Sequence, residues 1–149
     1  MRAALIAAGI EAEIQEFPAG TRTADDAARA LGTTAAQIVK SLVFLADGHP
    51  ILALVSGANR VDERKLAAAA GVQRVAKAAA DRVREATGYA IGGVPPVGHR
   101  RPLPAFLDQD LMQYEVVYAA AGTPTAVFPV TPGELIRASR AQPVDLRQI

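Results

Sequence analysis

Lys40 is the residue that stands out most from its surroundings. It interrupts the apolar run of residues 38–45, in which Ser41 is the only other polar residue. An ammonium group is costly to bury unless an anion or hydrogen-bond acceptors receive it. Two interpretations are open. Lys40 either binds a ligand, or it lies at a helix C-terminus, interacts with the helix dipole and extends toward solvent.

A second candidate is the glycine- and proline-rich segment of residues 92–99. Glycines let a backbone approach a ligand closely, and prolines keep the loop stiff. Fixed amide N–H groups in such a loop can stabilise an oxyanion, although a well-packed turn between two strands explains the same residues. The candidate donors are the amides of Gly92, Gly93, Val94 and Gly98.

Other kinds of reactive centre fit the sequence poorly. The glycine segment is not a nucleotide-binding P-loop, because His99 and Arg100 occupy the positions where that motif has Lys and Ser/Thr. There is no Gly-x-Ser-x-Gly elbow, which disfavours a Ser-His-Asp triad. Asp108 and Asp110 could contact a divalent cation, but their spacing after a strand is more typical of a helix cap. We therefore expect no metal and no cofactor.

Length and composition narrow the possible classes. The 149 residues, half of them hydrophobic, predict a single domain spanning residues 1–149. The absence of cysteine excludes disulfides, zinc-thiolate sites and cysteine nucleophiles. A net charge of +1 predicts that any nucleic acid is bound at one small site. No apolar run approaches the roughly 20 residues that span a bilayer, and no signal peptide is visible, so we expect a cytoplasmic protein.

Hydrophobic periodicity and end signals predict short elements. The turn Asp47-Gly48 predicts a β-hairpin, and Thr131-Pro132-Gly133-Glu134 predicts a capping box at a helix start. Because some strands alternate and others are apolar throughout, we expect an α/β (α+β) fold with a mixed, partly closed barrel-like sheet surrounded by short helices. Helices are expected at residues 1–8, 24–31, 61–70, 81–87 and 134–139, with a short one ending at 37, and strands at 13–17, 38–46, 51–55, 89–91, 106–107, 115–119 and 125–128.

Several segments, taken in order, resemble the YbaK/EbsC family, the free-standing relatives of the editing domain inserted in bacterial prolyl-tRNA synthetase. The resemblance covers roughly residues 14–146. The segments that carry it are TRTA at residues 21–24, AA at 27–28, LG at 31–32, QIVKSLVF at 37–44, GYAIGGVPPVGH at 88–99 and YAAAG at 118–122.

This resemblance implies deacylation of mischarged tRNA, most often tRNA for proline carrying a wrong small amino acid. Lys40 matches the family's functionally essential lysine, and residues 92–96 match its Gly-x-x-x-Pro loop. The Val-Pro-Pro-Val-Gly-His version resembles the subgroup linked to alanine or 2-aminobutyrate. The expected partners are the CCA acceptor end of tRNA and prolyl-tRNA synthetase, with neither DNA nor a membrane.

The resemblance and the chemistry together suggest a mechanism. An aminoacyl ester is already activated, so hydrolysis needs a positioned water and electrostatic help. Lys40 would bind phosphate or ribose oxygens of the terminal adenosine, and Gly92 and Gly93 would bind the carbonyl oxygen. The 2′-hydroxyl of the substrate or a loop carbonyl would orient the water. His99 could contact the ester or make a structural hydrogen bond. The expected substrate-binding residues are Val43, Phe44, Val94, Pro96, Gly98, His99 and Gly122.

Two other functions fit the same residues. One is a non-catalytic module that binds the CCA end or a synthetase, and the other is a small-molecule ester hydrolase. The near-neutral charge favours these two, because tight tRNA binding usually requires several cationic contacts. The intact lysine and loop favour the deacylase.

Overall fold

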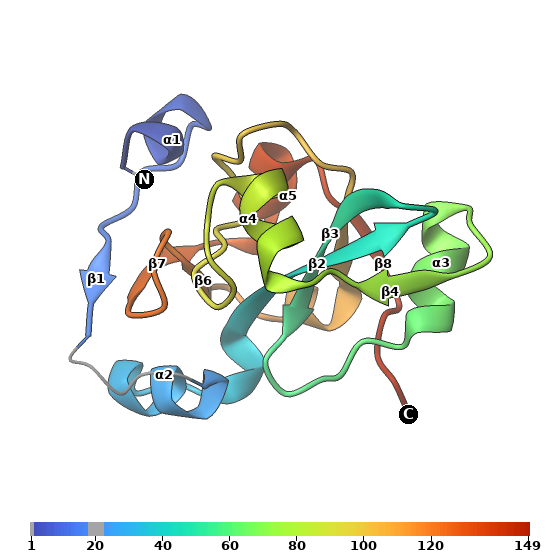
Figure 1. Cartoon of the computed structure of the whole chain (residues 1–149). Helices are drawn as coiled ribbons and strands as arrows, with labels where there is room; N and C mark the ends of the chain where they lie inside the picture. Colours follow the sequence, from blue (N-terminus) through green and yellow to red (C-terminus); the bar gives the residue numbers. More distant parts are fainter. Residues whose placement is uncertain (1, 18–22) are drawn as a thin grey trace.

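A long β-hairpin forms the centre of the fold. The computed structural model describes residues 2–17 and 23–149. In it β2 (Ile38–Ala46) pairs antiparallel with β3 (His49–Ser56). Asp47 and Gly48 form the turn, with φ of 51° and 81°. Positive φ at both positions is characteristic of the type I′ turn that joins tight hairpins. The predicted hairpin is confirmed (Figure 1).

The other strands extend the hairpin into a mixed sheet. The order is β1-β7-β6-β2-β3-β5-β8, and β4 pairs with β2 beside this path. Three of the pairs, β2–β6, β3–β5 and β5–β8, are parallel. The predicted mixed sheet is confirmed, but it stays open, since the path ends at the short strands β1 and β8. The additional strands are β1 (Gln15–Glu16), β4 (Val75–Lys77), β5 (Ala105–Asp108), β6 (Val117–Ala120), β7 (Ala126–Val130) and β8 (Gln142–Val144).

Three of the short helices begin at residues whose side chains cap them. Thr23, Asp62 and Thr131 each accept a hydrogen bond from a first-turn amide, and Thr131 with Glu134 forms the predicted capping box. The helices are α1 (Arg2–Ala7), α2 (Ala24–Leu31), α3 (Glu63–Ala70), α4 (Ala80–Thr87) and α5 (Pro132–Ser139), with 3₁₀ turns η1 (Ala35–Gln37) and η2 (Gln109–Gln113).

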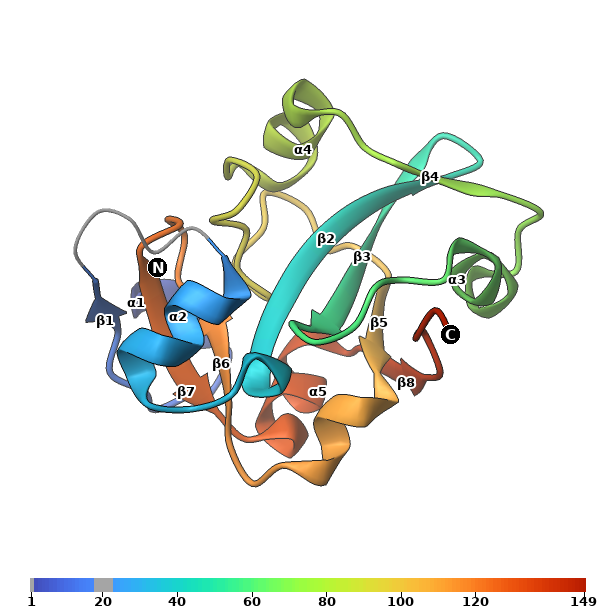
Figure 2. The ribbon, with the colours of Figure 1, turned by 90° about the horizontal axis from the view of Figure 1, so that it is seen from below.

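The two faces of the sheet have different covers. Val39 and Val43 of β2 belong to the largest core cluster, together with apolar residues of α1, α4 and α5. Phe44 follows Val43 along β2, so its side chain lies on the opposite face, where it packs against α3. Ile38 packs on α2. Figure 2 shows α2 and α3 apart from each other, with β2 running between them.

Some predicted elements differ from the structure. Residues 89–91 form a loop, because Gly88 ends α4 and the Tyr89 amide bonds back to the Thr87 hydroxyl. Residue 61 makes an isolated bridge with Arg147, so α3 begins after its cap at Asp62. Strands β4 and β8 and the turn η2 were not predicted. No helix in the described ranges is long and apolar enough to cross a membrane.

Candidate functional site

The candidate site lies at a gap in the pairing of β2. One edge of β2 pairs with β3, whereas the other edge has two separate partners. On that edge β6 pairs with Ile38 and Val39, and β4 pairs with residues 44–46. Between them, the Val43 carbonyl accepts a hydrogen bond from the Ala78 amide at 3.1 Å. Residues 40–42 therefore have no strand partner on this edge, and their outward backbone groups can serve a ligand.

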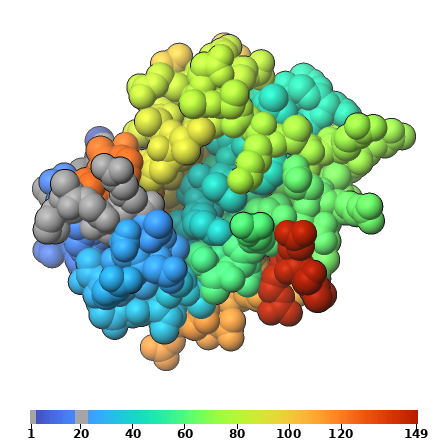
Figure 3. All heavy atoms as spheres, turned by 60° about the horizontal axis from the view of Figure 1, so that its bottom comes forward, coloured from blue at the N-terminus to red at the C-terminus, as the bar shows by residue number. Residues whose placement is uncertain are grey.

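A cavity of about 500 Å³ opens at this gap. Its walls come from the start of α2, the middle of β2, the end of β4, the loop after α4 and the turn between β6 and β7. Figure 3 shows the hollow, with β2 in its floor between α2 and that loop. The volume is in the range of small-molecule sites, roughly 300–1,000 Å³.

Lys40 lines the cavity from the face of β2 that carries α2 and α3. Its Nζ donates to the Asn59 carbonyl oxygen at 2.7 Å. Burial lowers the pKa of Lys40, the positive charges of Lys77 and Arg60 lower it further, and Asp108 opposes them. Because Lys40 lies in mid-strand, the interpretation as a helix C-terminus does not hold. Clustered cations at a cavity favour an anionic group in the ligand.

A polar network holds the acceptor of Lys40 in place. The Asn59 side-chain amide donates to Asp108 at 2.8 Å and to Asp110 at 2.9 Å. Asp108 is fully buried and also accepts from the amides of Ser56 and Asp110. Asp108 thus caps η2, in agreement with the cap interpretation. It also fixes the loop that presents the Asn59 carbonyl to Lys40.

The glycine- and proline-rich loop is fastened at both ends by Thr87, the last residue of α4. The Tyr89 amide donates to Thr87 Oγ1 at 3.0 Å, and the Arg100 amide donates to the Thr87 carbonyl at 3.1 Å. Thr87 Oγ1 in turn donates to Val83 at 2.7 Å. The loop therefore leaves and rejoins the fold at one buried residue, which limits its movement.

Within this loop, Gly92 and Val94 line the cavity. Their N–H groups have no hydrogen-bond partner in the described part of the chain. The Gly93 amide instead donates to the Ala90 carbonyl at 3.0 Å. A Cβ on Gly93 would lie 2.8 Å from Thr123 Cα, so Gly93 packs directly on the β6–β7 turn. The structure thus offers Gly92 and Val94 as donors and gives Gly93 a packing role.

Val43 lines the cavity, as expected of a pocket wall, but Phe44 does not. Phe44 is fully buried on the opposite face of the sheet, in the cluster that includes Leu66 of α3. Adjacent residues of a strand point to opposite faces, so the two could not both form one wall unless the cavity crossed the sheet at that point.

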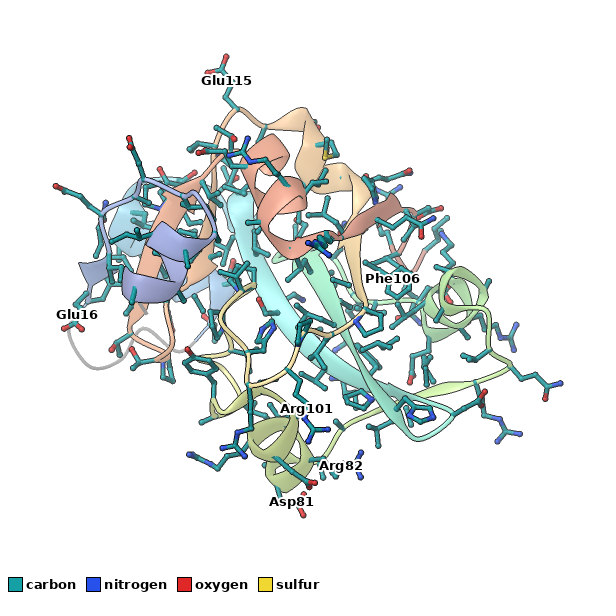
Figure 4. All side chains as sticks on the ribbon, turned by 90° about the horizontal axis from the view of Figure 1, so that it is seen from above. Glu16, Asp81, Arg82, Arg101, Phe106 and Glu115 are labelled. Carbon is teal, nitrogen blue, oxygen red and sulfur yellow. The ribbon has the colours of Figure 1, made fainter. Side chains whose placement is uncertain are left out.

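His99 makes a structural hydrogen bond. Its Nε2 lies 2.6 Å from the Pro95 carbonyl oxygen, and because a carbonyl only accepts, Nε2 carries the proton. Burial lowers the pKa of His99, and this hydrogen bond opposes the shift. Arg101 is exposed on the segment between α4 and β5 (Figure 4). Four of the expected substrate-binding residues do not line the cavity: Pro96, Gly98, His99 and Gly122. The cavity lining also lacks Arg100 and Arg101.

Comparison with known proteins identifies the family. A family model described as an aminoacyl-tRNA editing domain matches residues 18–138. The chain belongs to this family. A crystal structure described as a proposed trans-editing enzyme for prolyl-tRNA synthetase is 49% identical, with a TM-score of 0.95 and coverage of 99% of this chain and 94% of that one. Residues 21 and 22 of the family resemblance lie outside the described residues.

Two curated relatives are also similar to this editing domain. A protein of Enterococcus faecalis named as a proposed Cys-tRNA(Pro)/Cys-tRNA(Cys) deacylase, EbsC, is 29% identical over 121 residues, which are 75% of this chain and 74% of that protein. The proline–tRNA ligase of Elusimicrobium minutum is 39% identical over 82 residues, which are 55% of this chain and 14% of the ligase.

Three features of the editing domain's cavity were not found from the sequence. Ser41 and Lys77 line it, and Gly57 lets its wall close. A Cβ on Gly57 would clash with the Ala35 carbonyl oxygen, so η1 packs directly on this residue. Ser41 did carry a local signal, as the second polar residue of the apolar run. Lys77 and Gly57 carried no local signal, because long-range pairing brings them to the site.

Proposed function

We propose that this chain is a trans-acting aminoacyl-tRNA deacylase that hydrolyses the ester between tRNA and a wrong small amino acid. The expected substrate is tRNA for proline that carries alanine or 2-aminobutyrate. The observation that carries the proposal is one cavity that is lined by Lys40, Gly92 and Val94 in a member of the editing family. The amides of Gly92 and Val94 have no hydrogen-bond partner among the described residues. The similarity to a prolyl-tRNA ligase supports the choice of tRNA.

Each side of the cavity suits one part of an aminoacyl-adenosine. Lys40 and Lys77 provide positive charge for phosphate or ribose oxygens. The amides of Gly92 and Val94 can donate to the ester carbonyl oxygen as negative charge develops on it. A water oriented by the substrate's 2′-hydroxyl or by a loop carbonyl attacks the carbonyl carbon. The bond to the ribose 3′ oxygen then breaks, and that oxygen leaves as a hydroxyl with a proton from the water.

Selection of a small amino acid follows from the apolar part of the cavity. Val43, Val83 and Val94 line it and belong to the largest core cluster. Because these side chains are packed into the core, the space beside them cannot expand freely. A synthetase rejects a smaller look-alike by only about 1–3 kcal/mol per methylene, so a second site that admits short side chains corrects the residual errors.

The second candidate is a binding module for the CCA end or for a synthetase. It is favoured by the composition of the cavity: among the described lining residues there is no histidine, and Asp25 is the single carboxylate. A cavity without an evident general base needs the substrate's own hydroxyl for turnover. The two candidates therefore differ in whether bound ester is hydrolysed.

The test is a panel of tRNA for proline charged with alanine, 2-aminobutyrate, cysteine or proline. We expect deacylation of the alanyl and 2-aminobutyryl forms, and a loss of roughly 100-fold in kcat/KM in Lys40→Ala, since a charge-assisted contact is removed. Lys65→Ala is the matched control, because Lys65 pairs with Asp145 at 2.8 Å and does not line the cavity.

The other outcomes identify the alternatives. Binding of the charged tRNA without turnover supports the module. Hydrolysis of small esters without any activity on tRNA supports a small-molecule hydrolase. Cysteinyl-tRNA as the preferred substrate keeps the deacylase and overturns the choice of amino acid.

A further inference from the structure

Ser41 has a buried hydroxyl without a hydrogen-bond partner. Within the described ranges, Ser41 Oγ is the buried side-chain polar atom that lacks one. The other two serines are satisfied: Ser56 Oγ donates to Ala36 at 2.8 Å, and Ser139 Oγ donates to Leu135 at 2.6 Å. A buried hydroxyl without a partner destabilises the fold, so this exception calls for an explanation.

The position of Ser41 points to a ligand as the missing partner. Ser41 lines the cavity, inside the stretch of β2 that has no strand partner on the outer edge. The Val43 carbonyl points to this edge, where it meets Ala78. Residues two apart in a strand direct their backbone groups to the same edge, so the Ser41 carbonyl also points into the gap. Ser41 thus has two oxygen acceptors at the cavity wall: the carbonyl, which points into the gap, and the buried Oγ.

We propose that Ser41 binds the α-amino group of the aminoacyl ester through these two oxygens. This inference rests on the proposed function and names the group that distinguishes an aminoacyl ester from a simple acyl ester. Each part of the aminoacyl ester then has its own binding group. The loop amides bind the carbonyl oxygen, Val43 and Val94 contact the side chain, and Ser41 binds the amino group.

The geometry of β2 also separates the charges. Lys40 and Ser41 are adjacent, so their side chains leave the strand on opposite faces. A substrate amino group at Ser41 is therefore kept away from the Lys40 ammonium. Lys40 can then bind phosphate or ribose oxygens of the nucleotide part of the substrate. This placement avoids the repulsion that would arise if the substrate amino group and the Lys40 ammonium shared one face of β2.

Two non-hydrolysable adenosine analogues test the proposal by calorimetry. One is 3′-deoxy-3′-(alanylamino)adenosine, and the other is its propionylamino counterpart, which lacks only the amino group. We expect the wild type to bind the alanyl analogue roughly 10- to 100-fold more tightly, as for a hydrogen bond to a charged group. Ser41→Ala removes Oγ but keeps the backbone carbonyl, so it should lower this preference by roughly three- to tenfold and leave affinity for the propionyl analogue within about twofold.

Stability measurements separate a ligand-binding role from a structural one. Ser41→Ala should melt at the same temperature as the wild type or higher, because no internal hydrogen bond is lost. Ser139→Ala is the matched control: it loses a formed hydrogen bond, so it should melt lower while keeping the preference for the alanyl analogue.

The contrary outcomes show whether the role of Ser41 alone is wrong or the deacylase proposal is wrong as well. If the wild type binds both analogues equally, or Ser41→Ala weakens both equally, the role of Ser41 is wrong and the deacylase proposal stands. If the wild type binds neither analogue, the proposed function fails, and the role of Ser41 fails with it. A melting temperature of Ser41→Ala as low as that of Ser139→Ala shows a structural partner and also overturns the inference.

Discussion

The sequence reveals Lys40 as an unusual residue, but it does not reveal the group that accepts a hydrogen bond from it. The lysine stands out within its apolar run, but the group that receives it is the backbone carbonyl of Asn59. That carbonyl is positioned by Asp108 and Asp110, about 50 residues further along the chain. A residue type can therefore indicate a buried charge, whereas its partner depends on how distant strands come together.

The depressed pKa of Lys40 predicts how stability depends on pH. Burial is the main cause of the shift. Between the lowered pKa and about 10.4, the ordinary lysine value, the unfolded chain binds more protons at this site than the folded one. Stability from this group therefore rises with pH in that alkaline window. We expect the unfolding free energy of the wild type to rise relative to Lys40→Met between pH 8 and pH 10.

Chemical denaturation of both proteins at each pH measures this difference. Because the two chains share every other titratable group, their difference isolates residue 40. A difference that falls as pH rises would mean that the folded state favours the charged lysine, contrary to its burial. Such a result would place the ammonium in a well-satisfied anionic site before any ligand binds.

At the scale of elements, the loop of residues 92–94 acts by its close contact with the β6–β7 turn. We expect Gly93→Ala to be destabilised by a few kcal/mol, because its Cβ would lie 2.8 Å from Thr123 Cα. The displaced loop would also carry the Gly92 and Val94 amides away from the cavity. Deacylation should therefore fall by roughly tenfold or more, as measured together with the melting temperature.

Gly133→Ala is the matched control for this substitution. Gly133 lies in the first turn of α5 with no heavy atom within 4 Å of an added Cβ. Alanine there should raise stability by about 0.5–1 kcal/mol through helix propensity and should leave deacylation unchanged. Equal effects of the two substitutions would show that the Gly93 contact does not position the loop.

The elements that could be predicted from the sequence are those with local signals. The hairpin at Asp47-Gly48 and the capping box at Thr131 depend on residues within four positions of each other. Strand β4, in contrast, has three residues and exists because it pairs with the end of β2. The gap that forms the cavity depends on where β4 and β6 stop along β2, so no local pattern could reveal it.

At the scale of the whole molecule, charge is nearly balanced, with 16 basic and 15 acidic side chains. A broad basic surface is therefore not available to hold tRNA by its backbone. The positive charge at the site is local: Lys40 and Lys77 are the cations that line the cavity in the described part of the chain. Recognition of tRNA should then depend on the acceptor end and only weakly on the rest of the molecule.

This arrangement predicts a shallow dependence of tRNA binding on salt. Two phosphate contacts to single-stranded nucleic acid give a slope of about −1.4 in log affinity against log salt, or roughly a sevenfold loss from 50 to 200 mM. Binding of amide-linked alanyl-tRNA measures the slope, and Lys77→Ala should reduce it by about 0.7. Arg101→Ala, on an exposed residue that does not line the cavity, should leave it unchanged. A slope several times steeper, or one sensitive to Arg101, would mean that the tRNA lies across a much wider face, because only many more phosphate contacts release that many counterions.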